Sequence, residues 1–449
     1  MKNIVLRSAI VAALGGLLFG FDTAVISGTT QALTEKFDLG TFALGFTVAS
    51  ALIGTIVGAL TAGRPSDRYG RKNVLLVIGV LYLVSAVGSA VVDNWYLFIF
   101  FRFIGGIGVG GASVTAPIYT AEIAPPRLRG RLVGLVQFNV VLGILLAYLS
   151  NYCIANLVGD TTAWRWMFGV EAAPAVLFIL LLFTVPESPR WLFLQGKKDL
   201  ARKNIALLTS SQAEAADVEH EIQEALESAG QEQEKVPFFV PQYRRVILLA
   251  VAIAAFNQLS GINAIMYYAP DIFRMAGAGD DSAFLQSVAV GGMNLVATMI
   301  ALTVIDKFGR RKLMLIGSIG YLISLGLIAT LFFTQGDNFG AVTSTLVLVS
   351  LLLFIAAHAF GQGAVIWVFI SEIFPNRVRA RGQALGSFTH WFGAAAISWT
   401  FPWIANGLGP AAAFALFFAC MVVQLVWVLK VMPETKGVPL EEMERKLAA

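Results

Sequence analysis

Long apolar stretches separated by short polar turns run along the whole chain. An apolar run of about 20 residues can cross a bilayer of about 30 Å as a helix. Backbone groups in hydrocarbon must pair within their own segment, and the runs lack the alternating pattern of barrel strands. The pattern therefore predicts an all-α membrane protein with twelve transmembrane helices, at 8–31, 43–63, 73–92, 94–119, 131–153, 167–185, 243–273, 283–305, 312–333, 341–371, 382–405 and 410–431.

Composition supports the membrane assignment. Of the 449 residues, 57% are hydrophobic and 13% are charged, whereas soluble domains carry about 25% charged residues. The first span follows Lys2 and Arg7 as a secretory signal would, but it lacks a small-residue cleavage pattern and carries Asp22. We therefore expect a retained helix. The two cysteines, Cys153 and Cys420, offer no disulfide framework.

Basic residues mark one side of the predicted topology. The turns after spans two, four, eight and ten are rich in Lys and Arg, whereas the turns at 93–94, 278–282 and 334–340 are poor in them. By the positive-inside rule the basic side is cytoplasmic, which places both termini in the cytoplasm. The net charge of +4 then follows from topology, and no nucleic-acid partner is expected. The short termini and brief external turns favour a bacterial inner membrane.

An internal duplication divides the chain. The motif at 67–71, Asp-Arg-Tyr-Gly-Arg, returns at 306–310 as Asp-Lys-Phe-Gly-Arg. Two further pairs follow in the same order, since 122–129 resembles 372–379 and Pro186-Glu187 resembles Pro433-Glu434. We predict an N-terminal six-helix bundle at 1–185, a cytoplasmic linker with short helices at 186–242, a C-terminal six-helix bundle at 243–432 and a cytoplasmic tail at 433–449. Two such halves can rock about a central site, as secondary transporters do.

The duplicated motifs place charges at the cytoplasmic ends of the spans. Exposed ion pairs contribute about 0–1 kcal/mol each, but a network formed in one conformation alone biases a two-state equilibrium. The alternative is that these charges only anchor helix ends at the lipid headgroups. The predicted cytoplasmic charge network consists of Asp67, Arg71, Glu122, Arg129, Glu187, Arg190, Asp306, Arg310, Glu372, Arg379 and Glu434.

With two more motifs, Arg-Phe-(x)-Gly-Gly at 102–106 and Pro-Glu-Ser-Pro-Arg at 186–190, the chain resembles the sugar porter family of the major facilitator superfamily. The resemblance covers essentially the whole chain. It implies two six-helix bundles, alternating access and a monosaccharide cargo, with no enzymatic activity, cofactor or metal, and a functional monomer. A polyol or inositol carrier and a non-transporting sugar sensor remain alternatives. A membrane enzyme lacks support, because the three histidines lie on different segments.

Two ionisable residues lie inside apolar spans, Asp22 in the first and Arg102 in the fourth. Charges there are costly, so they normally face a partner or a wet cavity. Arg102 can neutralise Asp22, and proton binding to Asp22 would release it. The family resemblance points the same way, since its proton-coupled members carry an acid at the position of Asp22. We therefore favour proton symport, and a structural ion pair in a proton-independent facilitator is the alternative.

Sugar recognition needs neutral donors and acceptors beside an aromatic face. Gln258 and Asn263 are five positions apart, so only a helix broken near Gly261 would aim both inward. The resemblance assigns Tyr267 and Tyr268 to an extracellular gate. For any single Asn or Gln the alternative is a hydrogen bond between helices. The predicted sugar-binding residues are Gln137, Asn257, Gln258, Asn263, Asn294, Trp367, His390 and Trp391, of which Gln137, Gln258, Asn263, Asn294 and Trp367 match the family's sugar contacts.

Three positions depart from the family pattern. Asn257 stands where relatives usually carry Gln, and the segment from Gly361 to Trp367 lacks the family's prolines, which leaves Gly361 and Gly363 to supply any break. His390 precedes Trp391 where relatives commonly place Asn or Gln. Its imidazole can contact sugar, titrate near neutral pH, or pack as a neutral side chain. These departures leave the identity of the sugar open.

Overall fold

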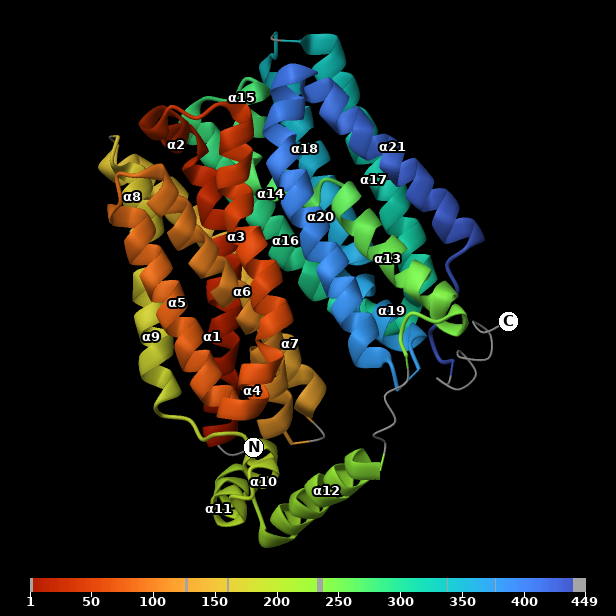
Figure 1. Ribbon diagram of the computed structural model, residues 1–449. Helices are drawn as coiled ribbons and strands as arrows, with labels where there is room; N and C mark the ends of the chain where they lie inside the picture. The colour runs from red at the N-terminus through yellow and green to blue at the C-terminus, as the bar shows by residue number, and fades with distance from the viewer. Residues whose placement is uncertain are drawn as a thin grey trace. The chain divides into compact units, whose positions relative to one another are not determined.

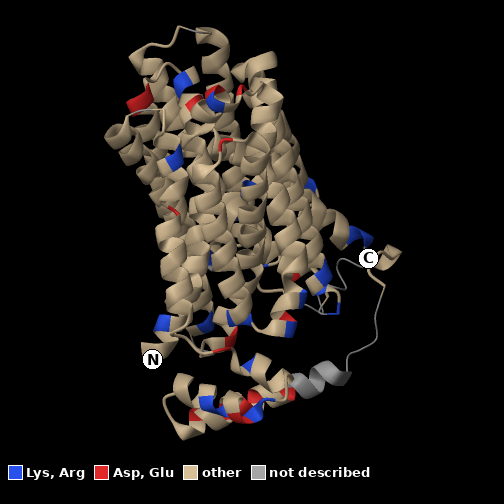
Figure 2. Cartoon of the chain, turned by 60° about the vertical axis from the view of Figure 1, so that its left-hand side comes forward, with Lys and Arg blue, Asp and Glu red and all other residues tan. Residues whose placement is uncertain are grey.

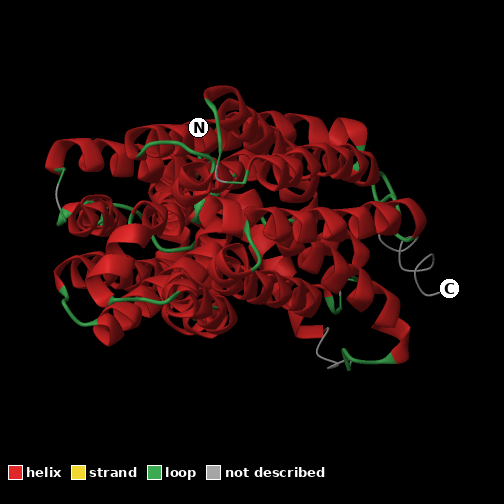
Figure 3. Cartoon of the chain, turned by 90° about the horizontal axis from the view of Figure 1, so that it is seen from above, coloured by secondary structure: helices red, strands yellow, loops and turns green. Residues whose placement is uncertain are grey.

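In the computed structural model, the described residues are 3–125, 128–159, 161–231, 237–336, 338–375 and 377–438. Their regular secondary structure is entirely helical (Figure 3). The helices, labelled in Figure 1, are α1 (Asn3–Val25), η1 (Ile26–Gly28), α2 (Thr30–Phe37), α3 (Thr41–Thr61), α4 (Gly63–Tyr69), α5 (Arg71–Val91), α6 (Trp95–Ile123), α7 (Arg129–Val158), α8 (Ala163–Gly169), α9 (Ala172–Leu182), α10 (Pro189–Leu194), α11 (Lys198–Leu208), α12 (Gln212–Gln231), η3 (Pro241–Tyr243), α13 (Arg244–Leu259), α14 (Ile262–Tyr267), α15 (Ala269–Met275), α16 (Asp280–Phe308), α17 (Arg310–Gln335), α18 (Ala341–His358), η4 (Ala359–Gly363), α19 (Ala364–Ile373), α20 (Arg379–Gly407) and α21 (Pro410–Lys430).

Eleven helical segments of the described chain are long and apolar enough to cross a membrane. They correspond to every predicted span except 382–405. That span is present as α20, a helix of 29 residues that carries the polar residues Gln383, Ser387, Thr389 and His390. Figure 2 shows that most charged residues lie at helix ends and along α10, α11 and α12. The predicted all-α membrane architecture is confirmed.

The chain forms two compact units. Unit 1 comprises Met1–Asp22, Gly54–Gly143 and Phe168–Lys235, and unit 2 comprises Thr23–Ile53, Ile144–Met167 and Val236–Ala449. Helices α1, α3, α7 and α8 therefore contribute residues to both units. The division into bundles at 1–185 and 243–432 is a prediction about halves of the sequence, and it stays a prediction.

Glycines let helices of unit 1 pack with their backbones in contact. A Cβ at Gly58 of α3 would lie 2.2 Å from the Ile107 carbonyl oxygen of α6, and one at Gly110 would lie 2.2 Å from that of Thr55. Small residues at such crossings are typical of membrane helix pairs. The glycine-rich stretch of α6 thus serves helix packing.

The linker helices α10, α11 and α12 belong to unit 1 (Figure 1). Trp191, Leu192 and Phe193 of α10 form a small apolar core with Ile205 of α11 and Ile222 of α12. The Ser188 hydroxyl caps α10 by accepting from the Trp191 amide at 3.2 Å. The indole Nε1 of Trp191 donates to the Asp67 carbonyl oxygen at 2.8 Å, which fixes α10 to the end of α4.

Two spans of unit 2 are interrupted. The expected break at Gly261 is present, since this residue has φ +86° between α13 and α14, a conformation that glycine adopts without strain. The segment at Gly361 and Gly363 forms a π-helical turn, η4, between α18 and α19. Such turns re-aim the side chains that follow them and are frequent at functional sites.

Candidate functional site

A buried ion pair joins two membrane-spanning helices of unit 1. Arg102 Nη1 of α6 donates to Asp22 Oδ1 of α1 at 2.6 Å, and Nη2 donates to the Asp22 carbonyl oxygen at 3.3 Å. The two side chains are only 1% and 2% exposed. The Arg102 guanidinium also lies 5.2 Å from the centre of the Phe168 ring. The two ionisable residues singled out by the sequence are therefore brought together in an apolar setting.

A third ionisable residue, Glu171, completes this cluster. It lies between α8 and α9, is 1% exposed, and its Oε1 has no hydrogen-bond partner among the residues that the structure describes. It interacts electrostatically with Asp22 and Arg102. One guanidinium cannot neutralise two carboxylates, so the cluster has a place for a proton. Our sequence reasoning missed Glu171, although it lies inside the predicted span 167–185 and carries the same signal that singled out Asp22.

The helix break at Gly261 assembles an amide cluster in unit 2. Asn263 Nδ2 of α14 donates to Gln258 Oε1 of α13 at 2.7 Å, and Gln258 Nε2 donates to Asn257 Oδ1 at 2.9 Å. A Cβ at Gly261 would lie 2.5 Å from the Phe417 ring, so glycine is needed for space as well as for its φ. Asn257 and Gln258 are buried, and Asn263 is half-buried.

Helices α19 and α20 add aromatic rings to this amide cluster. Gln258 Nε2 lies 3.2 Å from His390 Nδ1 and 3.4 Å from Nε2. The His390 ring lies 5.1 Å from the Trp367 ring and 4.9 Å from the Trp391 ring, centre to centre. Trp391 is buried, whereas Trp367 keeps 42% of its surface exposed. The arrangement offers amide groups and an accessible indole side by side.

The remaining predicted sugar contacts are more scattered. Asn294 of α16 is half-buried, and its Oδ1 accepts from Thr298 Oγ1 at 3.5 Å within the same helix. Gln137 lies exposed on α7 in unit 1. Their contact with sugar stays a prediction.

Both predicted gate tyrosines are buried at the end of α14. The Tyr268 hydroxyl donates to the Ser398 carbonyl oxygen of α20 at 2.9 Å, and its ring lies 5.3 Å from that of Phe401. Tyr267 is 3% exposed. In unit 2 these contacts tie the end of α14 to α20, and gating by either tyrosine stays a prediction.

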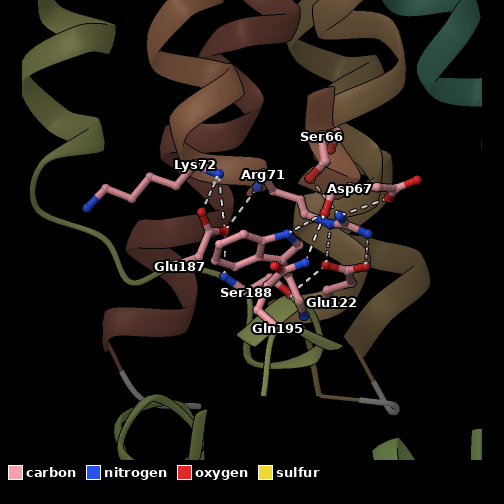
Figure 4. Close-up of polar contacts among 9 residues, drawn as sticks. Ser66, Asp67, Arg71, Lys72, Glu122, Glu187, Ser188 and Gln195 are labelled. Carbon is pink, nitrogen blue, oxygen red and sulfur yellow. Dashed lines mark hydrogen bonds and ion pairs between the residues drawn. The ribbon is translucent and has the colours of Figure 1, made fainter. Parts of the chain in front are cut away.

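At the duplicated motifs of unit 1, a glutamate caps a helix (Figure 4). The Glu187 carboxylate accepts from the backbone amides of Arg71 at 3.1 Å and Lys72 at 3.1 Å, which begin α5, and from that of Ser188 at 2.8 Å. Free amides and the helix dipole make a helix start a site for negative charge. Burial raises the pKa of Glu187, and these backbone hydrogen bonds oppose that rise.

The Arg71 side chain links the start of α5 to the other motifs of unit 1. Its Nε and Nη2 form a fork with the Glu122 carboxylate of α6 at 2.9 and 3.0 Å, and Nη1 donates to Asp67 Oδ1 at 3.1 Å (Figure 4). The Ser188 hydroxyl donates to the same Glu122 carboxylate. Three sequence motifs, each separated by 50 residues or more, thus meet at one point.

Unit 2 repeats this arrangement. Glu434 accepts from the backbone amides of Arg310 at 2.9 Å and Arg311 at 3.1 Å, which begin α17. Arg310 forms a fork with Glu372 at 3.1 and 2.7 Å, and the Thr435 hydroxyl donates to Glu372 at 2.6 Å. The duplication seen in the sequence is therefore a duplication of contacts.

Of the other four residues of the predicted network, three lie outside these clusters, and the side chain of the fourth is not described. Arg129 donates to the Ala121 carbonyl oxygen at 3.1 Å and pairs at 3.6 Å with Glu221 of α12. Arg190 is exposed on α10, and Arg379 Nε and Nη2 have no hydrogen-bond partner among the described residues. The side chain of Asp306 lies outside the described part of the structure.

Comparison with known proteins places these features in a family. The sequence profile of the family described as "Sugar (and other) transporter" matches residues 8–447. The chain is 40% identical over 484 aligned residues to the D-xylose-proton symporter of Escherichia coli K12, covering 99% of this chain and 96% of that protein. It is 36% identical over 451 residues to the arabinose-proton symporter of Bacillus subtilis 168, covering 99% and 95%.

Solved structures agree. The inward-open xylose transporter XylE from E. coli superimposes with a TM-score of 0.85 at 37% identity, covering 98% of this chain and 99% of that one. XylE bound to 6-bromo-6-deoxy-D-glucose gives a TM-score of 0.76 at 37% identity, with 99% of both chains covered. The chain therefore has the major facilitator fold, is an integral multi-pass membrane protein, and belongs to the sugar transporter family.

Proposed function

We propose that this protein carries a monosaccharide across the membrane by alternating access, in symport with a proton. The Asp22–Arg102–Glu171 cluster is the observation that carries the proton coupling. Asp22 and Arg102 alone would balance each other's charge. Glu171 adds a second buried carboxylate, whose Oε1 has no hydrogen-bond partner in the described part of the chain, so a bound proton is needed to balance the cluster. The names of the relatives support both the sugar class and the coupling.

The coupling follows from charge balance in a water-poor site. With Asp22 ionised, Arg102 is held by two of its nitrogens against α1. When Asp22 takes a proton, Arg102 loses the negative charge to which it donates its hydrogen bond of 2.6 Å. Glu171 is then the anion that remains beside it. Buried charges must keep a partner, so this exchange favours a different packing of α1 against α6. A proton bound on one side of the membrane can then be released on the other.

The sugar is assigned to the amide and indole groups of unit 2. Hydroxyl groups of a sugar both donate and accept, and Gln258, Asn263 and Asn294 offer both kinds of group. Trp367 supplies the exposed aromatic face against which the C–H side of a sugar ring packs. Gln137 of unit 1 is proposed as a further contact on the strength of the family match.

The cytoplasmic clusters are proposed to stabilise one conformation of the carrier. Glu187 and Glu434 each hold the start of one helix, and Arg71 and Arg310 each join that helix to a neighbour. By the positive-inside rule this side faces the cytoplasm together with both termini. We further propose that the protein works as a monomer in a bacterial inner membrane.

The test is proton-driven uptake in proteoliposomes, with D-xylose, arabinose, glucose, galactose, fructose and inositol each offered at two pH values. We expect accumulation of at least one monosaccharide when the outside is acidic, and Asp22→Asn should abolish accumulation while sugar exchange persists. Asp271→Asn is the matched control, because Asp271 is also paired with an arginine, Arg274 at 2.9 Å, but lies on α15, beyond Tyr267, where the apolar segment of the structure ends before the predicted limit of 273.

The outcomes separate the alternatives. Uphill uptake by Asp22→Asn would exclude coupling through Asp22. Exchange without accumulation in the wild type would show a proton-independent facilitator. Transport of inositol alone would identify a polyol carrier, and binding of sugar without any transport would identify a sensor.

A further inference from the structure

Several buried polar atoms on α5 and its neighbours have no hydrogen-bond partner among the residues that the structure describes. Helix α5 packs against α6 and α9 in unit 1. One face of α5 carries three such hydroxyl groups, at Tyr82, Ser85 and Ser89, and each residue is at most 1% exposed. Arg102 contributes its Nε, and Glu171 contributes its Oε1. Buried polar groups are rarely left unpaired, so this concentration of them needs a physical reason.

The hydroxyl groups of α5 lie beside the buried ion pair of unit 1. Tyr82 interacts electrostatically with both Asp22 and Glu171. A Cβ at Gly105 of α6 would lie 2.3 Å from Ser85 Oγ and 3.5 Å from Asp22 Oδ1. The Ser85 hydroxyl and the Asp22 carboxylate therefore face the same stretch of bare α6 backbone. Helix α5 thus brings hydroxyl groups close to both buried carboxylates.

The second copy of this helix satisfies the same hydroxyl groups. The Tyr-x-x-Ser pattern of α5 recurs at Tyr321 and Ser324 of α17, with the same spacing as the motifs at 67–71 and 306–310. The Tyr321 hydroxyl lies 2.6 Å from His358 Nδ1. The Ser324 hydroxyl donates to the Gly320 carbonyl oxygen at 2.8 Å, a bond that serine commonly forms within a helix. The unpaired hydroxyl groups are therefore a property of α5 and its surroundings, and the repeated pattern alone does not produce them.

Water is the ligand that fits the unpaired groups of unit 1. A hydroxyl group can donate or accept, the Arg102 Nε donates, and the Glu171 Oε1 accepts, so the set offers both kinds of partner. A buried water molecule typically forms about three hydrogen bonds to such groups. The Arg102 guanidinium would repel a metal cation, and the carboxylates of Asp22 and Glu171 would repel an anion. A small neutral molecule that both donates and accepts remains.

We propose that the unpaired groups of α5, Arg102 and Glu171 hold bound water, and that this water carries a proton between Asp22 and Glu171. The proposal rests on the proposed proton coupling and deepens it. A protonated Asp22 gives its proton to the nearest water, and the water at the other end gives a proton to the Glu171 carboxylate. Asp22 becomes an anion, Glu171 becomes neutral, and no other reactant takes part. Tyr82 and Ser85 are then positioning residues, because they hold the water and keep their own protons.

The first test detects the bound water in the wild-type protein, so it does not depend on the folding of any variant. Short X-ray pulses convert water to hydroxyl radicals, and these oxidise a buried side chain only where bound water lies next to it. Tyr82 and Tyr321 are both fully buried and occupy equivalent positions, so Tyr321 is the matched control. Mass spectrometry should find that Tyr82 is oxidised several times faster than Tyr321. Equal rates would overturn the water site, whether or not transport is coupled to protons.

The second test separates proton transfer from sugar movement. Tyr82→Phe combined with Ser85→Ala removes two hydroxyl groups and leaves the carboxylates and the guanidinium in place. Proton-driven accumulation of sugar in proteoliposomes should slow at least about tenfold, because a well-placed proton-transfer group contributes about a hundredfold or more to such a step. Sugar exchange at equal pH on both sides should persist. Tyr321→Phe combined with Ser324→Ala is the matched control and should leave the ratio of accumulation to exchange unchanged.

The contrary outcomes have distinct meanings. If accumulation and exchange fall together in the α5 variant, the hydroxyl groups have a structural role and the proton route is overturned. In a Glu171→Gln background the same two substitutions should add little, because the proton acceptor is already absent, and a full additional loss would also overturn the route. If the wild type shows no proton-driven accumulation, the proposed coupling fails together with the route, and the oxidation of Tyr82 still decides whether the water site exists.

Discussion

Gly70→Ala tests why the duplicated motif carries a glycine before the start of α5. Gly70 has φ +99° and ψ 155° immediately before α5. A Cβ there would lie 2.3 Å from Glu187 Oε2 and 3.0 Å from its Cδ. The substitution therefore imposes a strained backbone and also pushes away the carboxylate that caps the helix.

The two costs can be estimated separately. A non-glycine residue in this backbone region costs about 1–3 kcal/mol. Displacing the carboxylate weakens its bonds to the amides of Arg71 and Lys72, and a hydrogen bond to a charged group contributes about 1.5–3 kcal/mol. With one such bond lost, we expect Gly70→Ala to lower the free energy of unfolding by about 2.5–6 kcal/mol.

Gly409→Ala provides a matched control. Gly409 has nearly the same backbone, φ 89° and ψ 154°, and also precedes a helix, α21. A Cβ there would meet nothing within 4 Å. This variant therefore reports the backbone strain alone, and the difference between the two variants reports the carboxylate contact.

The assay is equilibrium unfolding of the purified protein in mixed micelles, with increasing SDS, followed by tryptophan fluorescence. Gly70→Ala should be less stable than Gly409→Ala by at least about 1.5 kcal/mol. In a Glu187→Ala background that gap should close, since no carboxylate remains to be displaced. Equal losses in both glycine variants, with Glu187 present, would refute the proposed role of the carboxylate.

Three further predictions concern single carboxylates and amides. Glu171→Gln should reduce proton-driven sugar accumulation but preserve exchange, and full accumulation at every pH would remove Glu171 from the coupling cluster. Gln258→Ala should weaken sugar binding by about 1–3 kcal/mol, measured by calorimetry, because sugar hydroxyls lose a partner. Burial raises the pKa of Glu187 above its ordinary 4.5, so its contribution to stability is full below pH 4.5 and falls as the pH rises above it. The wild type should therefore lose stability relative to Glu187→Gln as the pH rises from 4.5, measured by unfolding at a series of pH values, and a constant gap would contradict this.

The sequence by itself determined the class and the plan of this protein. The length of an apolar run decides whether it can span a bilayer. A charge in hydrocarbon is costly, so Asp22 and Arg102 can be recognised as functional candidates from the sequence, before their partners are known. Both quantities are properties of a local stretch of chain, so they need no knowledge of packing. The motif that contains Gly70 and recurs around Gly309 also indicates the duplication from the sequence alone. It does not show what either glycine does in the structure.

Only the tertiary structure decided which side chains meet. Glu187 caps a helix that begins 116 residues earlier in the chain, and His390 reaches an amide 132 residues away. Arg129 pairs with Glu221 of a linker helix rather than with the motif that surrounds it in the sequence. Such pairings depend on how closely and at what angle helices cross, which glycines such as Gly393 set. A periodic apolar pattern cannot encode those distances, because many crossings bury the same apolar surface.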